Sequence, residues 1–446
     1  MSTFVFDKLN NRILIFLFSV LGGLTVNLIG IISVSELYIL LISPWILRPE
    51  KLKSEKSLLT ATILYSTYLC CQLLSELVVG NSLNNWTRGI AVTIISFLTF
   101  IYLYDKIKKD KLLIIIYLSG LIVREYLFPT MEEEVDVAFK FHYGPMLLNA
   151  LLIVSYFLLK EQRRTLAIIL FYVTGFVYIA LDSRSMGLTI FFVGLIMQFG
   201  ESALRNRRKI MRWTLVLIGL SYGLYVIYIA AVLNKVYGGE HSYSQISQME
   251  QPYNPLNLLK TGRAEFFVAF EAISDAPFFG HGTWASDKNG KYIGKVFEYQ
   301  AGQINEEYLY QLLSEGGNYA TIPSHSIIMG AGVNNGLLAL LAITALILFF
   351  IWKCIQAMDF NSPFIFILTN SLLTIVWSSL FSPLPHLKNI FPFLFSIILV
   401  LYHKKMNGIK LKLLLLSLFK KKEVKQNSEN VDNTHFTNTK ECNFQT

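Results

Sequence analysis

Two arginines and a histidine stand in the polar parts of a mainly apolar sequence, and their side chains suit phosphate and hydroxyl chemistry. Arg184 lies in the short segment LDSRS, Arg263 in GRAEFF and His325 in PSHS. A guanidinium group binds two phosphate oxygens at once. A helix N-terminus disfavours imidazolium, so a neutral histidine there can accept a hydroxyl proton. An enzyme that used these three residues would carry out a transfer reaction on a phosphate-activated donor.

Each of these residues also has an ordinary structural role that the sequence leaves open. Arg184 would extend to lipid headgroups or pair with Asp182. Arg263 would pair with Glu265 or Glu271 on a solvated helix face, and the histidine would make a single polar contact. Spacing alone does not decide between the structural and the catalytic roles.

Several other kinds of chemistry have no sequence support. The sequence contains no P-loop, metal-ligand cluster, Ser-His-Asp signature or paired-carboxylate motif, so we expect no metal and no cofactor. The spacing of the four cysteines suits neither a disulfide framework nor a zinc site. The net charge of +9 does not indicate nucleic-acid binding, because the basic residues lie in connectors between apolar segments, where they set membrane topology.

The elements that must position these residues are membrane helices. The chain has 446 residues, 53% of them hydrophobic, and a mean hydropathy of +0.48. These values predict an all-α polytopic membrane protein. About twelve spans are expected, at 13–29, 32–47, 57–79, 88–104, 111–128, 144–160, 165–181, 185–200, 213–233, 333–352, 363–381 and 389–403. Two surface helices are also expected, at 255–275 and 305–315.

The distribution of lysine and arginine predicts the orientation. Most basic residues fall in alternate connectors and in the C-terminal tail, which places both termini in the cytoplasm and the long polar loop outside it. The expected regions are spans one to nine (1–233), a large extracytoplasmic loop (234–332), spans ten to twelve (333–403) and a basic tail (404–446). Within the tail, 409–422 is expected to lie on anionic lipid, and the end beyond Lys425 is expected to be disordered.

The order of the short motifs resembles the O-antigen polymerase and O-antigen ligase superfamily of bacterial membrane glycosyltransferases. The matching motifs are SRS around Arg184, GRAE around Arg263, PFFGHG at 277–282 and SHS around His325. The resemblance covers roughly residues 165–350. The sequence departs from the family pattern just after His325, where it has two isoleucines and a glycine-rich break.

The resemblance implies a helical bundle similar to C-type glycosyltransferase folds in the bacterial inner membrane, with its active site facing the periplasm. It implies that Arg184 and Arg263 hold the pyrophosphate of an undecaprenyl-linked oligosaccharide, and that His325 serves the acceptor hydroxyl. No metal or cofactor is implied. Further substrate contacts are assigned to the outer-facing residues Arg88, Arg124, Gly280 and Gly282.

The leading hypothesis is an O-antigen or related surface-polysaccharide polymerase. It would transfer a growing glycan from undecaprenyl pyrophosphate to a lipid-linked repeat unit, with inversion at the anomeric carbon. The alternatives are a ligase that transfers the glycan to lipid A core and, from another class, a transporter or flippase of lipid-linked sugars. Membrane lipids and a chain-length regulator protein are the expected partners, and nucleic acid is not.

Overall fold

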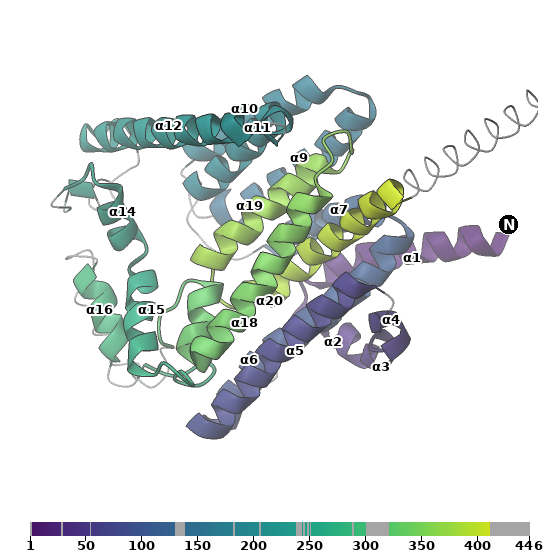
Figure 1. The fold of residues 1–446 in the computed structure, drawn as a ribbon, viewed down its shortest axis with the longest axis horizontal. Helices are drawn as coiled ribbons and strands as arrows, with labels where there is room; N and C mark the ends of the chain where they lie inside the picture. The colour runs from purple at the N-terminus through teal and green to yellow at the C-terminus, as the bar shows by residue number, and fades with distance from the viewer. Residues whose placement is uncertain are drawn as a thin grey trace, which may run out of the picture.

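The computed structural model is nearly all-α (Figure 1). It describes residues 2–27, 30–53, 55–129, 139–181, 183–204, 207–237, 243, 246–247, 249, 251–287, 290–299 and 321–410. The predicted helix 305–315, the acidic run 132–134, Asp182 and the tail beyond residue 410 lie outside these residues.

The N-terminal region contains a small hairpin and short helices where two spans were predicted. Its elements are α1 (Ser2–Leu21), β1 (Thr25–Asn27), β2 (Ile31–Ser33), α2 (Val34–Leu41), α3 (Ser43–Ile46) and α4 (Pro49–Lys53). The two strands pair antiparallel. The prediction of a single membrane-spanning helix over 32–47 was therefore wrong. Ser33 starts α2 through a capping box with Glu36, and Pro44 has no N–H with which to continue that helix.

The long helices lie over the remaining predicted apolar segments. They are α5 (Lys56–Val79), α6 (Leu83–Lys109), α7 (Leu113–Leu127), η1 (Phe139–Tyr143), α9 (Gly144–Lys160), α10 (Arg164–Ala180), α11 (Arg184–Leu204), α12 (Arg207–Leu233), α18 (Ile327–Ala357), α19 (Ile365–Phe381) and a helix at 391–410. Among the described residues, four helical segments are long and apolar enough to cross a membrane, namely 56–79, 83–109, 139–160 and 327–357. The structure thus supports a membrane protein without establishing twelve spans.

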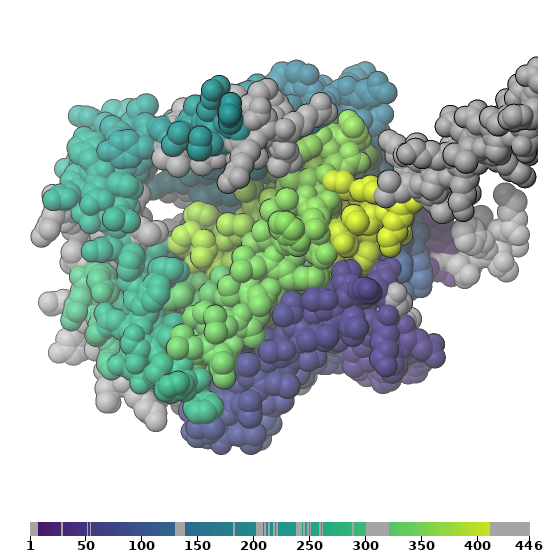
Figure 2. All heavy atoms as spheres, viewed as in Figure 1, coloured from purple at the N-terminus to yellow at the C-terminus, as the bar shows by residue number. Residues whose placement is uncertain are grey.

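The core forms where the C-terminal helices pack against the N-terminal ones. In Figure 2 the green chain of α18 lies between the purple N-terminal helices and the teal middle of the sequence. The buried rings of Phe350 and Phe395 stack with their centroids 3.6 Å apart, which joins α18 to the helix 391–410. Ser396 Oγ donates to Phe100 O on α6 (3.0 Å). These contacts hold α6, α18 and the last helix as one unit.

The predicted surface helix 255–275 is divided into two helices. Its parts are α14 (Pro255–Gly262) and α15 (Ala264–Asp275), and α16 (Lys291–Tyr299) follows. Arg263 interrupts the helix because its backbone is not helical (φ −146°, ψ 43°). The prediction of one continuous helix was therefore wrong, and Arg263 lies at a bend rather than on a helix face.

Helix α18 is also broken, at Gly336 (φ 80°, ψ −177°). A break of this kind frees backbone groups that a buried helix must satisfy elsewhere. Residues 277–283, here called the 277–283 turn, supply the missing partners. The bonds run from His281 N to Val333 O (2.9 Å), from Gly282 N to Asn334 O (2.8 Å) and from Leu337 N to Pro277 O (2.8 Å). The turn is thereby fixed to α18 by its backbone.

Candidate functional site

Arg184 is the first residue of α11 and lies against α12. Its guanidinium donates a hydrogen bond to the hydroxyl of Tyr228, and its central carbon lies 4.8 Å from the centroid of that ring. Just before it, the backbone N–H of Ser183 donates to Tyr178 O (2.9 Å), which fixes the turn from α10 into α11. The half-buried arginine is therefore oriented by an aromatic side chain of the next helix.

Arg263 lies at the bend between α14 and α15 and faces the end of α19. Its guanidinium carbon is 5.8 Å from the ring centroid of Phe381. The sequence left open a pairing with Glu271, but that carboxylate instead forms an ion pair with Lys295 on α16. Within the described part of the chain, Arg263 forms no ion pair. Its charge is therefore not neutralised by an acidic side chain there.

His325 is exposed and precedes α18, at the same end of α19 as Arg263. The next residue, Ser326, caps α18 through Met329 N (3.2 Å) and donates its hydroxyl proton to Ser379 O on α19 (2.8 Å). His325 also lies close to His386 in the short helix α20 (His386–Asn389). Burial, and then electrostatic repulsion from the nearby His325 ring, lower the pKa of His386.

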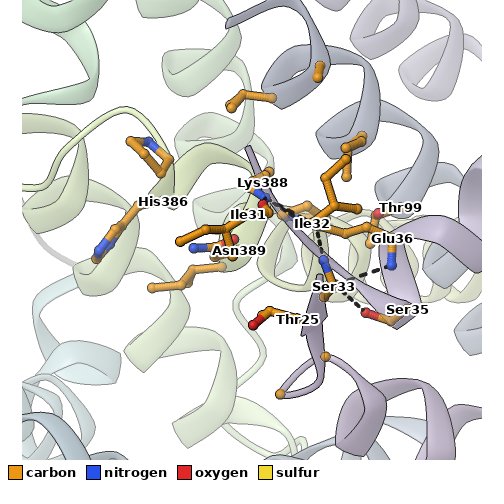
Figure 3. A pocket seen from close by; sticks show the side chains of 18 of the residues that line it. Thr25, Ile31, Ile32, Ser33, Ser35, Glu36, Thr99, His386, Lys388 and Asn389 are labelled. Carbon is orange, nitrogen blue, oxygen red and sulfur yellow. Dashed lines mark hydrogen bonds and ion pairs between the residues drawn. The ribbon is translucent and has the colours of Figure 1, made fainter. Parts of the chain in front are cut away.

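A cavity of about 910 Å³ lies beside these histidines (Figure 3). It is enclosed by the hairpin β1–β2 and parts of α1, α2, α6, α7 and α20. Arg88 of α6 and Arg124 of α7, which the sequence assigned to substrate binding, both line it, together with His386 and Lys388. Trp284 and several smaller polar side chains complete the wall. The structure therefore brings two separate sequence predictions onto one surface.

Four of the charged side chains along this wall form two ion pairs. Lys388 Nζ lies 2.9 Å from Glu36 Oε1 and donates to Ile31 O (3.2 Å). Arg124 Nε donates to Glu125 Oε1 (3.0 Å). Paired charges present donors and acceptors side by side with little net charge. Such a wall suits a neutral, many-hydroxyl ligand better than a pyrophosphate.

Gly280 and Gly282, also assigned to substrate binding, have backbone roles in the structure. Both have positive φ, 66° and 84°, in the 277–283 turn. A Cβ added to Gly280 would lie 2.5 Å from the carbonyl carbon of Asn334. Gly280 therefore lets the turn approach α18 closely, whereas a Cβ on Gly282 would lie 2.7 Å from Asn81 Nδ2, just beyond the end of α5.

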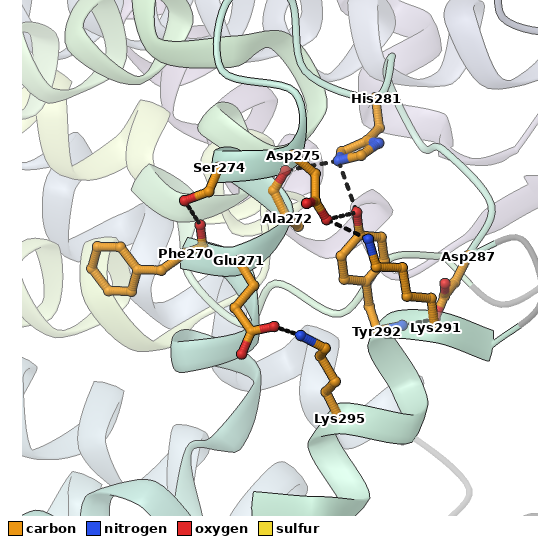
Figure 4. Close-up of polar contacts among 10 residues, drawn as sticks. All are labelled: Phe270, Glu271, Ala272, Ser274, Asp275, His281, Asp287, Lys291, Tyr292 and Lys295. Carbon is orange, nitrogen blue, oxygen red and sulfur yellow. Dashed lines mark hydrogen bonds and ion pairs between the residues drawn. The ribbon is translucent and has the colours of Figure 1, made fainter.

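A polar network fixes α16 to α15 beside this turn (Figure 4). Asp275 Oδ2 accepts hydrogen bonds from Lys291 Nζ (2.6 Å) and Tyr292 OH (2.7 Å). The bond from Lys291, followed by that from Tyr292, lowers the pKa of Asp275, while burial and the Asp275 carboxylate raise the pKa of Tyr292. His281 Nε2 lies 2.8 Å from Ala272 O and donates to it. The network positions α16 against the helix that follows Arg263.

The cavity wall includes residues that sequence reasoning did not select. Glu36, Glu125, Trp284 and Lys388 belong to no motif of the sequence. Acidic residues in the predicted spans or at their ends were the available signal, because a charge there is costly unless it is paired. Among the described residues, no three His, Cys, Asp or Glu side chains are grouped to hold a metal ion.

No family model matches this sequence, and no curated protein matches it either. The functional reading therefore depends on the arrangement of the residues themselves.

Proposed function

We propose that the protein is a membrane glycosyltransferase that polymerises lipid-linked oligosaccharides at the outer face of the bacterial inner membrane. The observation that carries the proposal is the cavity of about 910 Å³, lined by Arg88, Arg124 and Lys388 and bounded by His386 next to His325. Its volume falls in the range of ligand pockets. Its paired charges fit the sugar units of an acceptor.

Arg263 and Arg184 would hold the donor. Arg263 lies near the ring of Phe381 and has no acidic partner among the described residues, so its N–H groups remain suited to phosphate oxygens. A polyprenyl pyrophosphate brings negative charge and an apolar tail to a membrane surface. The donor would therefore lie at the end of α19, and the acceptor sugar in the cavity on the other side of His325 and His386.

In the proposed reaction, an acceptor hydroxyl oxygen forms a bond to the anomeric carbon of the donor glycan. The bond between that carbon and the pyrophosphate oxygen breaks, and undecaprenyl pyrophosphate leaves with its charge held by the arginines. The hydroxyl proton passes to His325. Attack from the face opposite the leaving group inverts the anomeric carbon.

The test uses purified protein in nanodiscs with a lipid-linked repeat unit as both donor and acceptor. The expected product is a ladder of longer lipid-linked glycans. Lys388→Ala should raise the acceptor concentration needed for half-maximal rate, because it breaks the pair with Glu36 in the cavity wall. Lys353→Ala, at the far end of α18, is the control. Absence of any polymer with the wild-type protein would contradict the proposal.

The ligase alternative differs only in its acceptor. In a deletion strain, lipid A core carrying one repeat unit indicates a lost polymerase. Bare core with accumulated lipid-linked polymer indicates a lost ligase. The break in α18 favours a second candidate, a transporter of lipid-linked sugars, because broken helices often form the substrate sites of transporters. Movement of labelled lipid-linked repeat unit across proteoliposomes without polymer formation would support transport instead.

A further inference from the structure

Glu76 is a buried carboxylate in the last turn of α5. The residue is 5% exposed. Its Oε1 accepts a hydrogen bond from the backbone N–H of Thr283 in the 277–283 turn. Its Oε2 is buried and has no hydrogen-bond partner among the residues that the structure describes. In the described part of the chain, no lysine, arginine or histidine forms an ion pair with Glu76. An unpaired buried charge is costly, so this oxygen needs a partner.

A second buried oxygen, which has no partner among the described residues, belongs to Asn335, and this residue also bonds to Thr283. Asn335 is 2% exposed and immediately precedes the break in α18. Its Nδ2 donates to Thr283 Oγ1 (3.1 Å), while its Oδ1 is buried and accepts no hydrogen bond. Both side chains are therefore held by Thr283, and each keeps one oxygen that lacks a donor.

The surrounding backbone makes this location favourable for a cation. Helix α5 ends three residues after Glu76, and the first part of α18 ends at Asn335. The C-terminal end of a helix carries a partial negative charge. Two such ends, a carboxylate and an amide oxygen thus meet around Thr283. In membrane proteins, carbonyl groups at broken helices and the C-terminal ends of half-helices are known ligands of sodium ions and protons.

We propose that Glu76 Oε2 and Asn335 Oδ1 bind one monovalent cation of the size of sodium beside Thr283. One carboxylate balances a single positive charge, whereas calcium sites usually gather several carboxylates. The ion would join α5 to the break in α18 and hold the 277–283 turn between them. The proposal is independent of glycosyl transfer, because it concerns a different set of residues.

The direct test is binding of radioactive sodium to the purified wild-type protein in detergent. The expected result is one saturable site per chain. Thermal unfolding is then measured as sodium chloride replaces choline chloride at constant ionic strength. The midpoint should rise with sodium and level off as the site fills, because an ion that binds only the folded state stabilises it. Potassium at equal concentration should give a smaller shift.

Glu76→Gln keeps the shape of the side chain and removes its charge. In this variant the midpoint of thermal unfolding should no longer depend on the sodium concentration. Glu161→Gln, on an exposed surface pair with Arg163, should leave the dependence unchanged. The proposal is overturned if the wild-type protein binds no sodium. It is also overturned if sodium raises the unfolding midpoint of Glu76→Gln as much as that of the wild-type protein. If Glu76→Gln does not fold, the wild-type binding measurement still decides the question.

Discussion

Arg263 keeps its guanidinium beside the ring of Phe381, and no described acidic side chain neutralises it. A stacked guanidinium still presents N–H groups at its edge, where a phosphate binds. Arg124 and Lys388 in the cavity wall are paired with Glu125 and Glu36. This difference between an unpaired and two paired cations is the residue-level reason for the proposal that donor pyrophosphate binds at one location and acceptor sugar at the other.

Replacing Arg263 by alanine should reduce turnover on lipid-linked substrate by roughly a hundredfold or more, the usual effect of removing a group that stabilises transition-state charge. Lysine should restore only part of the rate, because an ammonium cannot bind two phosphate oxygens in a fixed plane. The control is Arg163→Ala, an exposed residue paired with Glu161. Unchanged turnover in well-expressed Arg263→Ala would return this arginine to a structural role.

His325→Ala should slow the chemical step by roughly a hundredfold, the range expected for a positioned general base. Donor affinity should remain nearly unchanged, because the arginines carry the phosphate contacts. Turnover of the wild-type protein should fall as pH decreases, since a protonated imidazole cannot accept a proton. The alanine variant should lose this acid limb. Weakened donor binding with an unchanged pH profile would identify His325 as a phosphate contact instead.

His386 should make the folded protein less stable in acid. Its pKa is lowered in the folded state by burial and by His325, so the unfolded chain binds more protons. Stability therefore rises with pH and is lost as pH falls below about 6.5, the ordinary histidine value. His386→Gln should weaken this loss. The measurement is the thermal midpoint between pH 5 and 8, and an identical pH dependence in the variant would contradict the assignment.

Among the helices and turns, apolar runs predicted the long helices well, because a membrane helix needs little more than sufficient apolar length. The bends were harder to predict. The bend at Arg263 and the break at Gly336 both depend on tertiary contacts, with Phe381 and with the 277–283 turn respectively. Glycine at 336 permits a break, but the partners that satisfy it come from residues more than 50 positions away, which local periodicity does not reveal.

Gly336→Ala should destabilise the protein by about 3 kcal/mol, because its backbone conformation is nearly restricted to glycine. An added Cβ would also lie 2.1 Å from Phe278 O. Gly294→Ala is the matched control: this glycine lies inside α16 with nothing within 4 Å of an added Cβ. In this control the free energy of unfolding should increase by about 0.5 kcal/mol or more, because alanine favours a helix more than glycine does. Thermal unfolding in detergent compares the two, and equal midpoints would exclude strain at the break.

For the whole molecule, composition predicted a helical membrane protein, and the structure agrees. The sequence did not predict the cavity, because its wall combines short segments from α1 to α20 whose proximity depends on the complete fold. The hairpin β1–β2 in that wall replaced part of a predicted span. The sequence thus predicted individual candidate residues but not the cavity wall that Arg88 and Arg124 share.

The predicted orientation can be tested with a reporter that is active only outside the cytoplasm. Fused after Gly290, between the 277–283 turn and α16, it should be active. Fused after Arg208, at the beginning of α12, it should be silent, because the basic residues nearby favour the cytoplasmic side. The opposite pattern of activity would place the candidate site in the cytoplasm.

The bonds between α5 and the 277–283 turn also bear on the order in which the chain matures during synthesis. Ser75 Oγ donates to Phe279 O (2.5 Å), and Glu76 accepts from Thr283, across more than 200 residues. The same turn requires α18, which leaves the ribosome later still. A nascent chain that has inserted only its N-terminal helices therefore lacks the turn and the cap before α18. Premature termination would therefore leave a fragment in which the end of α5 lacks the turn that joins it to α18.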